Sequence, residues 1–328
     1  MNGSKFAFLA LCLVFFLACS DIDVIDPYTR AGAPTALEAS SSSSELSSSS
    51  DTGSSSSGAD SGSSSSGVVF ESCGALLFNP ATHFCFNGTP YELCGGTKDY
   101  DPPTQYCFNN SKVGTICGTR AERFDPDLYE CRDGDKIYLK TKFKDDGDNE
   151  YEAVLIGSQT WMAKNLNVVA DGSKCYHNLD ANCDTYGRLY NWATAMNIED
   201  RYNDESYTVQ AKHRGICPSG WHIPSTAEWS TLVNHADSLT SGIKLKASSI
   251  WRSNTGTDIY GFAAFPGGNI NDAGTSFSLT ENGIWWSATE FDRSKAWGWR
   301  MTHDNSYADR GNANKPNLYS IRCVKDGE

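Results

Sequence analysis

The cysteines constrain this 328-residue chain more than any other feature of its sequence. Of the twelve, Cys12 lies in an N-terminal apolar run and Cys19 directly follows that run. The other ten form an even set, which favours structural disulfides formed in an oxidising compartment: Cys73, Cys85, Cys94, Cys107, Cys117, Cys131, Cys175, Cys183, Cys217 and Cys323. No CxxC pair and no HExxH motif occurs, so we expect no zinc site and no other metal site.

Six of these cysteines belong to an internal repeat of three units. Each unit begins with Cys-Gly, continues with an aromatic residue, Asn or Asp, and Pro, and reaches its second Cys seven residues after the aromatic one. The aromatic residues are Phe78, Tyr100 and Phe124. Asn-Pro or Asp-Pro starts a turn and Asn-Gly or Asp-Gly continues one, so each unit predicts a small β-hairpin with too few apolar residues for its own core.

Disulfides within the units are expected to supply the stability that such small hairpins lack. The predicted pairs are Cys73–Cys85, Cys94–Cys107 and Cys117–Cys131, each contributing about 3 kcal/mol through the chain entropy of the unfolded state. The alternative joins neighbouring units through Cys85–Cys94 and Cys107–Cys117. Peptide mapping under non-reducing conditions distinguishes the two patterns.

The N-terminus has the organisation of a leader sequence. The apolar run from Phe6 to Ala18 has the length of a signal-peptide core and is too short to span a bilayer. It ends in Phe16-Leu17-Ala18-Cys19, which resembles the bacterial lipobox, although that motif prefers Leu where Phe16 stands. We therefore predict a lipoprotein signal peptide over 1–18 and lipidation of Cys19, which would anchor an exported protein to the outer membrane or cell surface. The alternative is an ordinary signal peptide that leaves a soluble exported protein.

Residues 19–69 are predicted to be a disordered linker. The segment is dominated by runs of serine with interspersed Gly, Asp and Glu, and it has too few apolar side chains to offset the entropy of ordering. A flexible coil of about 50 residues has a root-mean-square reach of roughly 40 Å, enough to hold the following residues away from a membrane surface.

The charge balance excludes one class of partner. The chain has 27 basic and 40 acidic residues, a formal net charge of −13, and no lysine- or arginine-rich block that would bind phosphates. We therefore expect no nucleic-acid partner. Past the leader no apolar stretch reaches transmembrane length, so contact with the membrane depends on the lipid at Cys19.

After the three cysteine repeats over 70–134, residues 135–328 have the composition of a globular domain. All nine tryptophans lie between Trp161 and Trp299. An apolar stripe with helical spacing predicts a helix over 186–196, and the capping box that begins at Ser225 predicts a second over 225–236. Strands are predicted over 153–156, 284–288, 296–301 and 319–324, and the glycine-rich stretch 255–283 is expected to be mostly loop.

Six segments of this region, in order along about 190 residues, resemble the Fibrobacter succinogenes major paralogous domain. They are Val154–Leu166, Tyr186–Trp192, Cys217–Pro224, Gly261–Gly268, Trp285–Glu290 and Ser320–Cys323. That family occurs on exported bacterial proteins and has no established activity. The resemblance therefore implies an architecture more than a function.

A shorter segment, Gly220–Trp229, is similar to the turn and helix of formylglycine-generating enzymes, whose fold is C-type-lectin-like. This resemblance implies an α+β domain with two helices, a long loop region and short antiparallel sheets that end in a Cys. It also implies a Cys217–Cys323 disulfide across the core and a local Cys175–Cys183 disulfide. In C-type lectins the partner of the last Cys lies on the first helix, whereas Cys217 follows it.

Catalysis is not expected from these residues. Formylglycine-generating enzymes use reactive cysteines and copper near their C-terminal strands, where this chain has only Cys323, already assigned to a disulfide. The acidic residues Asp258, Asp272, Glu281 and Glu290 show no spacing that selects a catalytic pair, and no Gly-x-Ser-x-Gly elbow occurs. We predict neither an enzyme nor a cofactor.

Binding is the favoured function, with carbohydrate as the ligand class that a lectin-like fold implies. The candidate ligand-binding residues are Trp285, Glu290, Asp272 and Asn269. The calcium-dependent triplets of C-type lectins are absent, and the acidic segment 145–150 lacks EF-hand spacing, so a plain acidic turn is favoured over a calcium loop. The alternative is a structural or adhesive envelope protein that contacts other surface proteins instead of polysaccharide.

Overall fold

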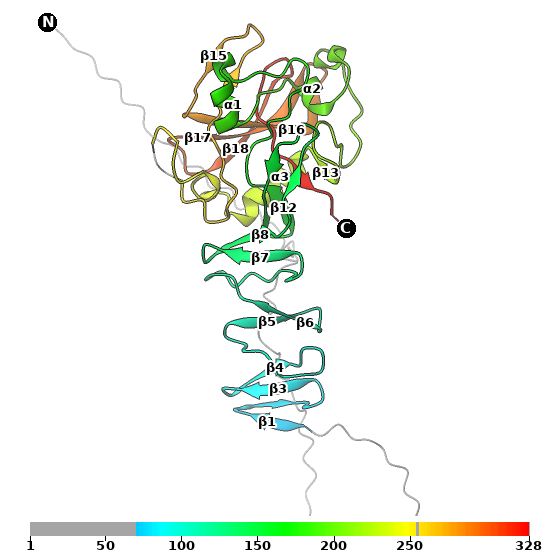
Figure 1. The fold of residues 1–328 in the computed structure, drawn as a ribbon, viewed down its shortest axis with the longest axis vertical. Coiled ribbons are helices and arrows are strands. Elements are labelled where there is room, and N and C mark those ends of the chain that lie inside the picture. The colour runs from blue at the N-terminus through cyan, green and yellow to red at the C-terminus, as the bar shows by residue number, and fades with distance from the viewer. Residues whose placement is uncertain (1–69, 254–255, 328) are drawn as a thin grey trace, which may run out of the picture. The chain divides into compact units, whose positions relative to one another are not determined.

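A series of small β-hairpins leads into a mixed α+β region in the computed structural model of the chain (Figure 1). The structure describes residues 70–253 and 256–327. The predicted signal peptide, the lipidation at Cys19 and the linker over 19–69 lie outside the described residues. Within the described ranges, no helix is long and apolar enough to cross a membrane.

The cysteine repeats form antiparallel hairpins, as their turn residues predict. Their strands are β1 (Glu71–Cys73), β2 (Leu76–Phe78), β3 (His83–Phe86), β4 (Thr89–Glu92), β5 (Gln105–Phe108), β6 (Lys112–Thr115), β7 (Tyr129–Arg132) and β8 (Lys136–Leu139). The strands pair as β1–β2, β3–β4, β5–β6 and β7–β8. At the Asn87-Gly88 turn both residues have positive φ, which Asn and Gly adopt at the lowest cost.

Each repeat contains its own disulfide. Cys73 pairs with Cys85, Cys94 with Cys107 and Cys117 with Cys131, closing loops with sequence separations of 12, 13 and 14 residues. The second Cys of each unit lies in the first strand of a hairpin, namely β3, β5 or β7. The intra-repeat pattern is thus the one present, and the alternative that links neighbouring units is not formed.

The aromatic residue of each later repeat packs on the hairpin before it. The Tyr100 ring meets the Phe84 ring edge-on at 5.4 Å, and its hydroxyl donates to the Glu92 carbonyl at 2.8 Å. In the same way the Phe124 ring contacts the Tyr106 ring, and the Tyr106 hydroxyl bonds the backbone of Phe124. The regular aromatic spacing in the sequence therefore reflects contacts between successive repeats.

The third repeat is part of the sheet of the globular region. Its hairpin β7–β8 joins β11 (Ala153–Ile156), β12 (Gln159–Met162), β19 (Val324–Lys325) and β13 (Trp221–His222) in a six-stranded sheet of order β13-β19-β12-β11-β8-β7. Tyr138 on β8 is the register partner of Val154 on β11. The predicted boundary between the cysteine repeats and the globular domain, after residue 134, lies in the turn between β7 and β8 and therefore within this sheet.

The remaining elements surround that sheet. The helical segments are η1 (Tyr176–Asn178), α1 (Asp180–Tyr186), α2 (Trp192–Met196), η2 (Asp200–Asn203), α3 (Thr226–His235) and α4 (Ser241–Leu245). The other strands are β9 (Phe143–Lys144), β10 (Glu150–Tyr151), β14 (Asn269–Ile270), β15 (Ser276–Phe277), β16 (Asn282–Asp292), β17 (Lys295–Thr302) and β18 (Ala308–Asn314). The three longest strands form the antiparallel sheet β16-β17-β18, and β9–β10 and β14–β15 form two-stranded sheets. The region is therefore α+β with antiparallel sheets of few strands.

One predicted helix is confirmed, and of the other only the C-terminal part is present, as α2. α3 begins with the complete capping box of Ser225 and Glu228. The predicted helix over 186–196 is interrupted, because Gly187 adopts φ 80° at the end of α1 and the backbone of Leu189 pairs with Lys174. The strand predicted over 319–324 is likewise reduced to isolated bridges before β19, although Tyr319, Ile321 and Cys323 all face one core cluster.

Two hydrophobic clusters meet at β16. Trp229 of α3 packs with Trp285 and Trp299 in one cluster, while Trp286 packs with Trp192 of α2 in the other. Trp285 and Trp286 are adjacent residues of β16. Both are fully buried, because successive residues of a strand face opposite sides and here each side of β16 faces a core.

The two resemblance-based disulfides are also present. Cys217 pairs with Cys323 across a sequence separation of 106 residues, and Cys175 pairs with Cys183 across 8. Both Cys217 and Cys323 are completely buried in the α2 cluster. The longer crosslink therefore joins the segment before β13 to the residue before β19, and these two strands pair in the six-stranded sheet.

Arg322 is buried beside that crosslink, and no carboxylate of the described residues bonds to it. Its guanidinium donates to the carbonyls of Met162, Phe262 and Ala263 and, twice, to Oδ1 of Asn165. Burial lowers the pKa of Arg322 to about 9. Carbonyl and amide oxygens thus replace the water that this cation loses on folding.

Candidate functional site: a polar cavity beside Glu290

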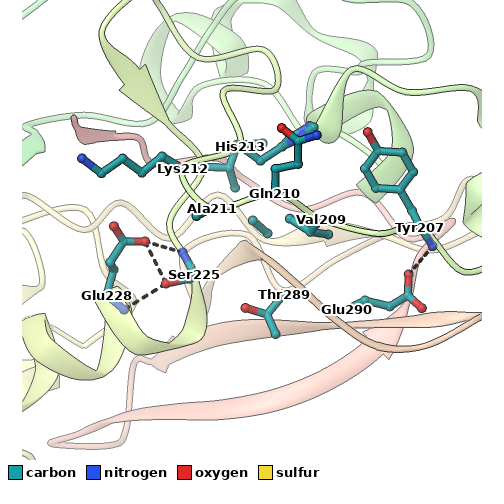
Figure 2. Close-up of a pocket in the computed structure, with 12 residues that line it drawn as sticks. Tyr207, Val209, Gln210, Ala211, Lys212, His213, Ser225, Glu228, Thr289 and Glu290 are labelled. Carbon is teal, nitrogen blue, oxygen red and sulfur yellow. Dashed lines mark hydrogen bonds between the residues drawn. The ribbon is translucent and has the colours of Figure 1, made fainter. Parts of the chain in front are cut away.

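A cavity of about 580 Å³ lies between the segment 207–213, the start of α3 and residues 288–290 of β16 (Figure 2). Its volume is in the range of small-molecule sites in proteins. The lining mixes hydroxyl, amide, imidazole and carboxylate groups with the apolar side chains of Val209, Ile223 and Ala288. We call it the Glu290 cavity.

Local structure holds its floor in place. The Ser225 hydroxyl accepts a hydrogen bond from the Glu228 amide at 3.3 Å, and Glu228 Oε2 accepts from the Ser225 amide and hydroxyl, both at 2.8 Å. Thr289 Oγ1 accepts from the Thr226 amide at 3.1 Å, which ties β16 to the first turn of α3. These bonds fix the relative position of α3 and β16 at the base of the cavity.

Glu290 is held by a buried lysine. Lys315 is fully buried, and its Nζ donates to Glu290 Oε2 at 3.1 Å and to the carbonyls of Tyr202, Glu205 and Arg293, each at 3.0 Å. The Tyr207 amide also donates to Oε2, at 2.8 Å. Among the described residues Glu290 Oε1 has no hydrogen-bond partner, so this oxygen can accept from a ligand in the cavity.

The other predicted ligand-binding residues do not join Glu290. Trp285 is fully buried, and its Nε1 donates to Asn165 Oδ1 at 2.9 Å, so its ring offers no face to a ligand. Asn269 belongs to β14, and Asp272 lies in the exposed turn between β14 and β15. Neither lines the Glu290 cavity. The prediction for Trp285 was therefore wrong, and Glu290 alone of the four lines this cavity.

The tryptophans offer little exposed surface for stacking against a sugar ring. Eight of the nine tryptophans are buried, which leaves Trp297 partly exposed. The Arg310 guanidinium lies 4.4 Å from the centre of the Trp297 ring, and Phe291 meets the same ring edge-on at 4.9 Å. Because neighbours contact this ring on the sheet surface, it is not an open stacking platform.

The four acidic residues considered for catalysis are held by different partners. Asp258 accepts from the Ala263 amide at 2.8 Å and pairs with Lys136, while Glu281 pairs with Arg252. Burial raises the pKa of Asp258. Asp272 is exposed and Glu290 pairs with Lys315. The structure gives these residues separate environments and no shared catalytic arrangement.

The acidic segment 145–150 forms the turn between β9 and β10. Asp145 is buried, and its carboxylate accepts from the amides of Gly147 and Asn149, the Asn149 side chain and the Tyr151 hydroxyl. These protein donors bond both oxygens of the Asp145 carboxylate. Within residues 70–253 and 256–327, no group of three or more His, Cys, Asp or Glu side chains is arranged to hold a metal ion.

The sequence did not reveal His222, which contacts the cavity wall. The side chain of His222 is 2% exposed, and its ring lies between two carboxylates: Nε2 is 2.7 Å from Glu228 Oε1, and Nδ1 is 2.6 Å from Asp326 Oδ1. Burial lowers the pKa of His222, but the hydrogen bonds to both carboxylates outweigh it and raise the pKa above 6.5. An imidazolium that donates from both nitrogens satisfies this geometry.

This charge arrangement predicts a pH-dependent stability. Because the folded-state pKa of His222 is raised, its contribution is fully present below its unfolded pKa of about 6.5 and is lost as pH rises through the folded value. The pKa of Glu228 is lowered despite burial, so its contribution is lost only as pH falls below about 4.5. Denaturant unfolding of the wild type and of His222→Gln, at pH 5.5 and at pH 9, should show their difference in stability shrinking at pH 9. An equal difference at both pH values contradicts a protonated His222.

Comparison with known proteins agrees with the sequence resemblance. Residues 154–325, more than half of the chain, match the Fibrobacter succinogenes major domain. No curated protein matches the chain, and no solved structure does. The matched segment runs from β11 to β19 and includes the Glu290 cavity, His222 and most residues of the two hydrophobic clusters. The chain belongs to the Fibrobacter succinogenes major domain family.

Proposed function

We propose that the globular region is a non-catalytic carbohydrate-binding module on an exported protein. The observation that carries this proposal is the Glu290 cavity, whose lining combines hydroxyl, amide and carboxylate groups with apolar side chains. A sugar offers the complementary surface, because its hydroxyls both donate and accept hydrogen bonds while its ring hydrogens form apolar patches. Glu290 Oε1, which has no hydrogen-bond partner among the described residues, and the exposed amide of Gln210 are the groups that we expect such a ligand to bond.

The absence of catalysis in this proposal rests on how the two cavity carboxylates are used. Glu228 accepts from His222 and Ser225, and Glu290 accepts from Lys315 and the Tyr207 amide. Burial acts to raise the pKa of Glu228, but the hydrogen bonds from His222 and Ser225 outweigh it and lower that pKa, so this carboxylate suits an acceptor and not a general acid. Both groups therefore support ligand positioning.

The C-type-lectin-like fold is part of the same proposal. In its support, α2 and α3 precede a long loop-rich stretch, the long strands β16 to β18 follow, and the Cys217–Cys323 disulfide closes the core. Cys217 lies after α2, so the crosslink differs from that of C-type lectins in its first partner. Any sugar binding in the Glu290 cavity would use protein groups instead of the calcium of those lectins.

We also propose that the chain is anchored through a lipid on Cys19 and held away from the membrane by the serine-rich linker. The support is the lipobox-like sequence together with five disulfides, which require an oxidising compartment. Metabolic labelling with an alkyne fatty acid tests the anchor. Label that persists in a Cys19→Ala variant would argue against it.

Binding to a broad glycan array tests the carbohydrate proposal. We expect retention that soluble sugar competes away, and we expect Gln210→Ala to weaken it about tenfold, as for the loss of one or two hydrogen bonds. Thr208→Ala is the matched control, because Thr208 is exposed in the same segment but does not line the cavity. Absence of binding across the array would instead favour the adhesive alternative, in which the chain contacts other surface proteins.

A further inference from the structure

A second cavity adjoins the first. It has a volume of about 380 Å³ and lies between the start of the third-repeat hairpin, the β11–β12 turn and the last residues of the chain. His222 lines it, so we call it the His222 cavity. Lys212 and Glu228 line both cavities, which places the two side by side at these residues.

The side chain of Lys212 lies across the junction. Lys212 is exposed, and its Nζ donates to the Gly327 carbonyl at 3.2 Å. Figure 2 shows the side chain extending from the 207–213 segment on the side of the cavity where Glu228 lies. An exposed lysine with a backbone carbonyl partner moves at little cost, because water replaces that bond. The junction is therefore not a fixed wall.

The far wall of the His222 cavity comes from the third cysteine repeat. Leu128 and Tyr129 line it, and Leu128 is 45% exposed. The Tyr129 hydroxyl and Thr160 Oγ1 are hydrogen-bonded at 2.6 Å, which joins the repeat to β12 across the cavity floor. Leu128 thus presents an apolar surface next to the polar groups of Ser158 and Lys325.

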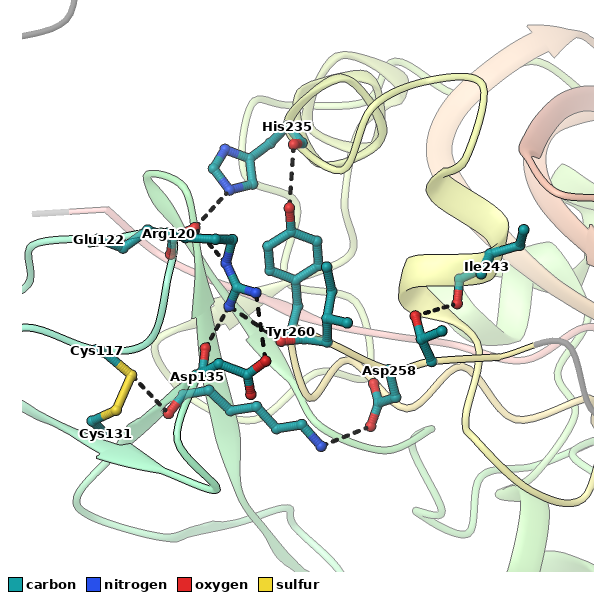
Figure 3. A network of polar contacts seen from close by, with 12 residues as sticks. Cys117, Arg120, Glu122, Cys131, Asp135, His235, Ile243, Asp258 and Tyr260 are labelled. Carbon is teal, nitrogen blue, oxygen red and sulfur yellow. Dashed lines mark hydrogen bonds and ion pairs between the residues drawn. A yellow bond between two sulfur atoms is a disulfide. The ribbon is translucent and has the colours of Figure 1, made fainter.

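A polar network holds this repeat in position (Figure 3). Arg120 lies 4.5 Å from the centre of the Tyr260 ring, donates to the Ile259 carbonyl at 3.1 Å and pairs with Glu122. Glu122 in turn contacts His235 of α3 at 3.3 Å, and Lys136 pairs with Asp258 at 3.6 Å. With its hairpin also in the six-stranded sheet, the third repeat is a rigid part of the domain.

From these observations we propose that the two cavities form one groove, continuous past Lys212, that binds a linear glycan of several sugar units. This inference rests on the proposed carbohydrate function and adds the ligand's class, a chain instead of a single sugar. A monosaccharide occupies the Glu290 cavity, which Leu128 does not line, whereas a polymer also places a unit in the His222 cavity and covers Leu128 with the apolar face of that unit. The third repeat then contributes directly to binding.

Calorimetric titration of the full chain with cello-, xylo- and chito-oligosaccharides of one to six units tests the groove. For whichever of the three oligosaccharide series binds, we expect the affinity to rise at least about tenfold from the single sugar to the tetramer. The Leu128→Asn variant should lose most of that rise and keep its affinity for the single sugar. Lys325→Ala should weaken the longer sugars in the same selective way. Leu77→Asn is the matched control, because Leu77 is 72% exposed on the first repeat, outside both cavities.

The outcomes separate the two proposals. Equal affinity at every chain length, or an equal loss for short and long sugars in Leu128→Asn, overturns the groove and leaves the carbohydrate module standing. Binding of no sugar in any series overturns the carbohydrate proposal and the groove with it. Unchanged melting temperatures for Leu128→Asn and Lys325→Ala show that their effects come from binding.

Discussion

Replacing Arg322 with methionine is expected to lower the free energy of unfolding by about 3–5 kcal/mol. Arg322 is fully buried, and its guanidinium is the donor for three backbone carbonyls and for Asn165 Oδ1. Methionine fills part of the volume but donates no hydrogen bond. Several of these acceptors would then be buried without their main donor, and each such group costs about 1–3 kcal/mol.

Denaturant unfolding under non-reducing conditions measures this loss through the midpoint, provided that the slope is unchanged. Arg300→Met is the matched control, because Arg300 is exposed on β17 and pairs with Asp309 at 2.7 Å. An exposed ion pair contributes about 0–1 kcal/mol. A similar small effect for Arg322→Met would show that the buried guanidinium does not hold the core together.

Removing the Cys217–Cys323 disulfide with a double alanine variant is expected to destabilise the protein by about 4–5 kcal/mol. The sequence separation of 106 residues makes this the largest loop that any disulfide of the described residues closes, and the unfolded chain gains the most entropy when it opens. Both sulfur atoms also belong to the α2 core cluster, so alanine leaves small voids there.

The Cys175→Ala/Cys183→Ala variant is the control, since its loop has a sequence separation of 8 residues and the same chain-entropy relation gives about 2.5 kcal/mol. Calorimetric melting of both variants and the wild type compares the two losses. If the two double variants melt at the same temperature, loop size does not determine the contribution of these crosslinks.

The repeat region was the part most accessible to sequence reasoning. Its turns depend on Asn, Asp, Gly and Pro within a few residues, and each disulfide joins cysteines 12–14 residues apart. The start of α3 was predictable for the same reason, since the Ser225–Glu228 capping box is a contact between near neighbours. Interactions that are local along the chain are visible in the sequence.

The segment after α1 shows where local reasoning fails. The apolar positions Leu189, Trp192, Ala193 and Met196 have helical spacing, yet the Leu189 backbone exchanges hydrogen bonds with Lys174, and Tyr190 does so with Tyr319. An added Cβ on Gly187 would lie 2.7 Å from the Asn165 side chain, so the chain turns there against a close neighbour. Long-range pairing thus overrides helical periodicity, and only α2 remains helical.

The candidate site also combines residues that the sequence identified with residues that only the tertiary structure revealed. Glu290 was among the predicted ligand-binding residues, and it does line the cavity. The sequence could not show that the Trp285 ring faces a core, because both sides of β16 are buried and period-two alternation does not say which side is exposed. His222 was also missed, since its partner Asp326 lies 104 residues away.

The sequence by itself determined the cysteine framework of the repeats, the family of the globular region and the helix that begins at Ser225, because these depend on spacing and on contacts between near neighbours. Tertiary structure alone decided that the third repeat joins the main sheet, that Arg322 and Lys315 are buried cations, and that Glu290 and the 207–213 segment enclose a cavity. Each of these arises from packing between segments tens of residues apart. Which segments pack together depends on the whole fold, and no pattern within a short stretch of the sequence indicates these contacts.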